Sequence, residues 1–134
     1  MRPTLDENGY VCGFPYHDGD LDGVLLGPND TVHLALRSVD GERRILTLLG
    51  VTQLSVDDFA RGNSVADLRL QPASQLREEE ALHRILAQRT FLDPDHVPEQ
   101  KMIFMLETSY GADIIAICDG IDVQMGELVV KLDA

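Results

Sequence analysis

Apolar and polar side chains alternate along much of this chain, and the alternation predicts strands rather than helices. The clearest case is residues 31–38, in which every second side chain is a large apolar one. Asp40-Gly41 follows, a dipeptide that tolerates the backbone angles of a tight hairpin turn. The run Arg43–Leu49 then leads back. We therefore predict a central β-hairpin around which the rest of the chain is organised.

Further strands are predicted on both sides of this hairpin. Alternating patterns or short apolar runs bounded by turn residues mark residues 21–27, 52–56, 64–70, 101–107, 113–118, 121–125 and 128–132. The dipeptide Asp119-Gly120 is a second hairpin signal. Residues 113–118 are apolar on both faces, which is typical of a covered strand and places Cys118 in the core.

One segment has a helical pattern. Leu82, Ile85 and Leu86 recur at helical spacing within residues 75–89, and Ser74 can cap the first turn. Strands joined by short turns, with a single helix between them, predict an α+β fold. Its expected architecture is a mostly antiparallel, twisted sheet of about six to eight strands with one main helix near residues 75–89.

Length and composition predict a single domain over residues 1–134, with residues 1–19 as a loosely packed N-terminal arm. A chain of this size buries about two thirds of its unfolded surface, so it needs no metal or disulfide to fold. The two cysteines make no disulfide framework, and residues 1–7 lack the apolar region of a signal peptide. We therefore expect a cytoplasmic protein with reduced thiols and no cofactor.

The net charge of −12 is concentrated at the two ends of the chain. Residues 1–30 carry −5 and residues 90–134 carry −7, whereas the segment between them is neutral. Such charge repels nucleic acids and anionic lipid, and it attracts basic proteins or divalent cations. We predict no nucleic-acid or membrane partner. The predicted contact residues for a basic protein are Asp18, Asp20, Asp22, Asp113, Asp119, Asp122 and Glu127.

The segment His17–Gly23 offers an alternative. Asp18, Asp20, Asp22 and the following glycine match the start of a calcium loop, D-x-D-x-D-G, in which alternate carboxylates converge on a cation. The match fails at the twelfth position, where Asn29 replaces the bidentate glutamate. The alternative function is therefore a divalent-metal-binding domain or metal-dependent hydrolase that uses His17 with the three aspartates. A homo-oligomer joined through an edge strand or the helix face is a third possibility.

Three stretches carry a resemblance to known proteins: residues 17–26, 50–63 and 109–118. They resemble small bacterial sheet proteins of uncharacterised function, some of which are similar to immunity proteins of polymorphic toxin systems. The resemblance implies a non-enzymatic binding role and supplies no site residues. We therefore expect an acidic protein-interaction module that neutralises a basic partner.

Overall fold

The computed structural model describes residues 1–77, 79–80, 84 and 97–128, and this part of the chain is nearly all antiparallel sheet. Its strands are β1 (Thr4–Leu5), β2 (Val11–Cys12), β3 (Asp20–Leu26), β4 (Val32–Arg37), β5 (Arg43–Leu49), β6 (Gln53–Asp57), β7 (Asn63–Pro72), β8 (Met102–Tyr110), β9 (Asp113–Cys118) and β10 (Gly120–Met125). All strands predicted up to residue 125 are present. The strand predicted at residues 128–132 lies almost entirely outside the described residues.

The predicted α+β class is wrong. Over the described ranges no helix reaches seven residues: η1 (Ala73–Arg77) is one short 3-10 turn after β7, and Glu80 and Arg84 are the other helical residues. Most of the main helix predicted near residues 75–89 lies outside the described residues. The physical reason is that the buried apolar side chains of the described chain come almost entirely from the strands, so a short apolar stripe at helical spacing does not set the fold class.

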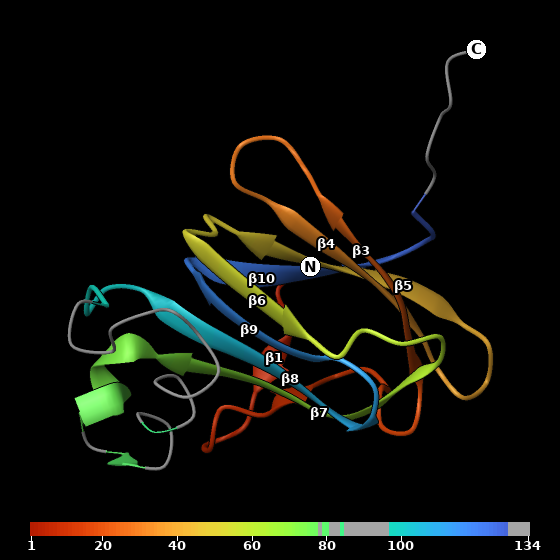
Figure 1. The fold of residues 1–134 in the computed structure, drawn as a ribbon, viewed down its shortest axis with the longest axis horizontal. Coiled ribbons are helices and arrows are strands. Elements are labelled where there is room, and N and C mark those ends of the chain that lie inside the picture. Colours follow the sequence, from red (N-terminus) through yellow and green to blue (C-terminus); the bar gives the residue numbers. More distant parts are fainter. Residues whose placement is uncertain (78, 81–83, 85–96, 129–134) are drawn as a thin grey trace.

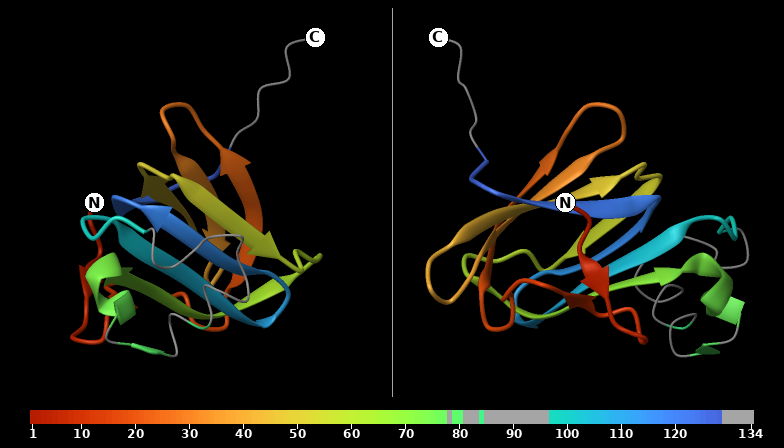
Figure 2. Two further views of the ribbon diagram at one scale, coloured as in Figure 1. Left: turned by 60° about the vertical axis from the view of Figure 1, so that its left-hand side comes forward. Right: turned by 180° about the vertical axis from the view of Figure 1, so that it is seen from behind.

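The eight larger strands form one antiparallel sheet with the order β10-β5-β4-β3-β7-β8-β9-β6. The predicted central hairpin is confirmed: β4 pairs with β5 so that Ala35 faces Ile45, and the turn contains Gly41 with φ of +90°. The strands wrap around a common interior, as Figures 1 and 2 show from three sides. β1 and β2 make a separate two-stranded sheet near the N-terminus.

The hairpin predicted at Asp119-Gly120 is wrong. β9 and β10 do not pair with each other; instead, Asp119 links them and the chain continues onward, with β9 beside β6 and β10 beside β5. The backbone nitrogen of Asp119 donates to the carbonyl of Leu49 (2.7 Å), and that of Thr52 donates to Ile117 (2.9 Å). The pairs β6–β9 and β5–β10 therefore form one long bent ladder. Because β10 continues β9 and pairs with β5, the strands β5, β4, β3, β7, β8 and β9 form a closed circuit.

The sheet has a core on each face. Its inner face encloses a large aliphatic cluster that includes Leu34, Leu46, Leu68, Phe104 and Ile114, all fully buried. Its outer face, over β8 and β9, carries a smaller cluster made of Ala73, Ile103, Met105, Ile115 and Ile117. The aliphatic alternation of the strands explains the first cluster. The second explains why residues 113–118 are apolar on both faces.

The N-terminal arm of residues 1–19 is bonded to β7. The backbone nitrogen of Leu70 donates to Gly9 (2.8 Å), and that of Asp18 donates to Val65 (2.9 Å). The side chain of Val11 is buried in the inner core. No helix in the described ranges is long and apolar enough to cross a membrane.

Candidate functional site

Two of the three aspartates in the calcium-like segment bind an arginine instead of converging on an empty site. The guanidinium of Arg37 contacts Asp22 (3.0 Å) and Asp20 (3.2 Å), and the bond to Asp22 raises the pKa of Arg37. Asp18 lies beside the exposed imidazole of His17, with 3.7 Å between its carboxylate and Nε2. Among the described residues no group of three or more His, Cys, Asp or Glu side chains is placed to hold a metal ion.

Three more of the predicted contact residues also have internal cationic partners. Asp119 pairs with Lys101 (2.7 Å), Glu127 pairs with Arg43 (3.3 Å), and Asp122 accepts from the amino group of Met1. The cation beside Asp122 lowers the pKa of that carboxyl. These carboxylates are therefore already balanced inside the molecule.

The two acidic ends of the chain do meet, with arginines between them. Asp22 from the N-terminal segment and Glu127 from the C-terminal segment line the same groove, together with Arg43 and Arg44. Arg37 adds a third guanidinium through its contact with Asp22. This part of the surface therefore carries both signs of charge.

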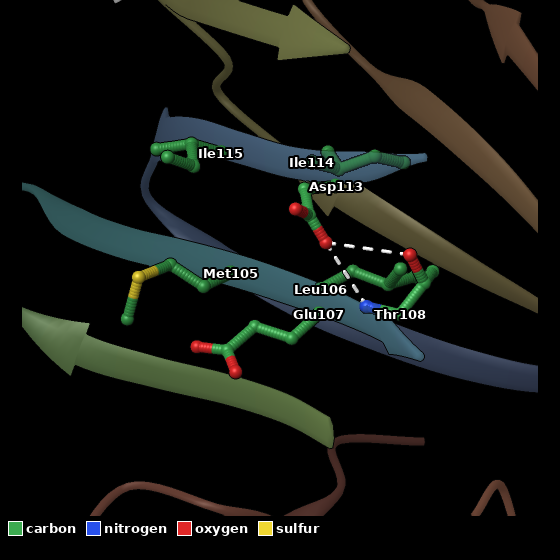
Figure 3. A pocket seen from close by; sticks show the side chains of 7 residues that line it. All are labelled: Met105, Leu106, Glu107, Thr108, Asp113, Ile114 and Ile115. Atoms are coloured by element: carbon green, nitrogen blue, oxygen red, sulfur yellow. Dashed lines mark hydrogen bonds between the residues drawn. The ribbon is translucent and has the colours of Figure 1, made fainter. Parts of the chain in front are cut away.

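Asp113 is placed differently from the other predicted contact residues. It begins β9, and its carboxylate accepts from the backbone nitrogen (3.0 Å) and the hydroxyl (3.4 Å) of Thr108 (Figure 3). On one side its cross-strand partner is Asp57 of β6. On the other side the register between β8 and β9 places it next to Glu107, one step beyond the Leu106–Ile114 pair.

Glu107 in turn pairs with Asp67 of β7. Directly paired residues of neighbouring strands point to the same face, about 5 Å apart. Four carboxylates thus follow one another across four adjacent strands, and we name them the carboxylate row: Asp57, Asp113, Glu107 and Asp67. Like charges placed directly opposite each other destabilise a sheet, which makes this row a costly arrangement for the fold.

Beside the row lies a groove of about 300 Å³. Met105 and Ile115, both from the outer core cluster, stand two residues along their strands from Glu107 and Asp113 and line the groove with them (Figure 3). Apolar side chains thus adjoin acidic ones. Because Met105 and Ile115 are both buried, a lysine or arginine that enters the groove meets mainly its carboxylates.

Asp113 is the one member of the row among the contact residues predicted from the sequence; Asp57, Asp67 and Glu107 are not among them. Asp57 and Asp67 occupy polar positions in alternating strands, where ordinary surface residues also lie, and Glu107 follows the apolar run of residues 102–106. What distinguishes them is the lateral alignment of β6, β9, β8 and β7. That alignment follows from pairings between residues far apart in the sequence.

The nucleophilic and basic side chains near these elements have other roles. Burial raises the pKa of the Cys118 thiol to about 11, which keeps it protonated and unreactive. The His17 imidazole is exposed and bonded through Nδ1 to the carbonyl of Ala66 (2.8 Å), and this bond and the nearby Asp18 raise its pKa. The hydroxyl of Tyr16 donates to the carbonyl of Val11 (2.7 Å).

Comparison with protein family models, curated proteins and solved structures finds no match for this chain. The carboxylate row and its groove are therefore the features of the molecule from which a function can be inferred.

Proposed function

We propose that this protein is a cytoplasmic, non-catalytic binding module that neutralises a basic protein partner, as immunity-type proteins do. The carboxylate row is its contact face. The observation that supports this proposal is the alignment of four carboxylates across β6, β9, β8 and β7 beside a groove.

Electrostatics favour the row over the other acidic residues as the contact. Asp20, Asp22, Asp119 and Glu127 each have an arginine or lysine within about 3 Å, so their field is largely cancelled at a distance. Among the described residues, Asp57, Asp67 and Glu107 form no ion pair with a lysine or arginine. A field from aligned carboxylates speeds the association of a basic partner, and salt weakens it.

The test uses a defined cationic probe, fluorescently labelled octalysine, with binding followed by anisotropy at low salt. We expect the double variant D67N/E107Q to bind about tenfold more weakly, because it removes half of the charges of the row, those on β7 and β8. The matched control is D30N/D40N, which removes two charges at the turns before and after β4. We expect its binding to fall about twofold at most, since distant exposed charges are screened.

Equal losses in both double variants would show that only total charge matters, and would overturn the row as the contact face. The natural partner is then sought by capture on the immobilised protein at low salt, followed by elution with high salt. A basic protein held by the native chain and by D30N/D40N, and lost from D67N/E107Q, is the expected result.

A further inference from the structure

A pocket of about 320 Å³ lies between the N-terminal arm and the β5–β10 pair, and we name it the arm pocket. It is lined by residues 1–4 and 12–14, by Arg44 of β5, and by Val123 and Met125 of β10. Small-molecule sites are typically concave, mostly apolar and at least about 300 Å³ in volume, with a few polar groups that orient the ligand. The arm pocket has this size and this mixture of side chains.

The walls of the arm pocket are fixed by contacts between distant parts of the chain. The backbone nitrogen of Val123 donates to the carbonyl of Met1 (2.9 Å), which holds Met1 beside β10 (Figure 2). Thr4 of β1 pairs with Cys12 of β2. The pocket is therefore built into the fold, and its shape does not depend on a single loop.

The arm pocket is cationic, although the protein as a whole is acidic. The chain carries 23 Asp and Glu residues against 11 Lys and Arg. Among the described residues that line the pocket, the charged side chains are Arg2 and Arg44, and none is acidic. The charge of this pocket is therefore complementary to an anion, which an acidic surface elsewhere on the molecule repels.

Arg44 is held in a fixed position at the pocket wall. Its side chain is 13% exposed, and its guanidinium carbon lies 5.4 Å from the centre of the Phe14 ring. Its two terminal nitrogens donate to Ser38 and to Glu42, both at 2.9 Å. A guanidinium has five N–H donors, so these two bonds leave donors for a further acceptor. The side chain of Glu42 is 51% exposed, and water screens its pairing with Arg44.

We infer that the arm pocket binds a small monocarboxylate with an apolar tail, of the class of the medium-chain fatty acids. The carboxylate accepts from the remaining donors of Arg44, whose planar fork matches the two carboxylate oxygens. The tail packs on Phe14 and Met125, and Arg2 adds attraction at longer range. The four members of the carboxylate row all belong to the described residues and do not line the pocket. This site is therefore separate from the one in the proposed function.

Cys12 lines the arm pocket, so the reactivity of its thiol reports whether the pocket is occupied. The full chain is alkylated with N-ethylmaleimide, and modification of Cys12 is followed by mass spectrometry. The buried Cys118 serves as the unreactive internal reference. We expect octanoate at about 2 mM to slow alkylation of Cys12 about threefold or more, whereas octanol, which has the same tail and no charge, slows it by about 1.3-fold at most. No protection by octanoate, or equal protection by octanol, would overturn the inference.

Substitutions at the rim test the role of the Arg44 charge. Met125→Glu sets a carboxylate directly opposite Arg44, where it competes with the ligand, and should weaken the apparent octanoate affinity about tenfold. Met125→Gln has the same shape without the charge and should weaken it about threefold at most. Leu26→Glu, exposed on β3 away from the pocket, should leave it unchanged. Equal weakening by the Met125→Glu and Met125→Gln variants, or by both glutamate variants, would overturn the inference.

The D67N/E107Q variant distinguishes failure of this inference from failure of the proposed function. It should weaken octalysine binding and leave octanoate protection of Cys12 unchanged, since Asp67 and Glu107 do not line the arm pocket. Loss of octanoate protection in this variant would overturn the separate site. Octalysine binding that is indifferent to D67N/E107Q would overturn the proposed function and leave the arm pocket in place.

Discussion

Asn63 is a buried polar residue that ties three segments of the chain together. Its Oδ1 accepts from the backbone nitrogens of Ala60 and Ala112, both at 2.9 Å. Its Nδ2 donates to the carbonyls of Ala60 (2.7 Å) and Leu21 (3.1 Å). One side chain thus uses its amide fully to join β3, the β6–β7 turn and the β8–β9 turn.

Replacing Asn63 with leucine removes all four bonds and leaves the backbone groups of Leu21 and Ala112 buried without a replacement partner. We expect Asn63→Leu to lower the free energy of unfolding by about 2–4 kcal/mol, measured by urea denaturation. Asn63→Asp keeps the acceptor for Ala112 and turns a carboxylate oxygen toward two carbonyls, so it should also destabilise. A change below about 0.5 kcal/mol in the leucine variant would contradict this role.

Cys118 makes the stability depend on pH in the alkaline range. Its pKa is about 11 in the folded protein against 9.0 for a free thiol, because burial disfavours the thiolate. Between pH 9 and 11 the unfolded chain loses this proton while the folded chain keeps it, so this contribution to stability is complete below pH 9 and is lost as the pH rises. We expect Cys118→Ala to lose less stability than the native chain over this interval, by about 2 kcal/mol in urea titrations.

At the scale of elements, the bend in the long ladder depends on Gly50. This residue has φ of +61°, and a β-carbon there would collide with the Asp119 carboxylate. Lys101 holds the bend by donating to the carbonyl of Gly50 (3.2 Å) and to Asp119 (2.7 Å). Space and backbone conformation at Gly50 therefore both favour glycine.

Gly50→Ala should lower the free energy of unfolding by about 2–4 kcal/mol, since strain at positive φ is added to displacement of Asp119 from Lys101. Gly41→Ala is the matched control, because Gly41 also has positive φ and nothing lies within 4 Å of its added β-carbon. We expect this control to cost about 1 kcal/mol. Equal losses in urea denaturation would show that the bend adds no constraint of its own.

The carboxylate row is an element-scale feature whose cost can be measured. Glu107 stands directly opposite Asp67 and beside Asp113, so its charge is repelled from both sides. We expect Glu107→Gln to raise the free energy of unfolding by about 0.5 kcal/mol at low salt, with the gain shrinking as salt is added. A loss of stability at low salt would contradict the repulsion.

Local patterns predicted the strands because alternation and turn dipeptides act between near neighbours, as at Asp40-Gly41. They did not predict the direction of the chain after Asp119, since a bend and a hairpin turn use similar residues. The row could not be predicted either, because Asp57 and Glu107 belong to strands aligned only by the finished sheet. The charge balance of Asp22 was equally hidden, as its partner Arg37 comes from the next strand.

At the scale of the whole molecule, the net charge of −12 gives a poor account of the surface. The acidic ends of the chain meet around Arg37, Arg43 and Arg44, where both signs are present. The middle of the chain, neutral in total, supplies Asp57 and Asp67 to the row. The fold thus gathers carboxylates from a segment of zero net charge into one row, and it places arginines among the carboxylates of the two acidic ends.

The closed circuit of strands has a consequence for how fast the protein folds. Its closing pairs join residues such as Leu49 and Gly120, which lie far apart along the chain, whereas the β4–β5 hairpin joins near neighbours. Distant pairs carry a larger loop-closure entropy, so the circuit closes late. We expect refolding to take milliseconds to seconds in stopped-flow experiments, with pulse labelling protecting the β4 amides before those of β10.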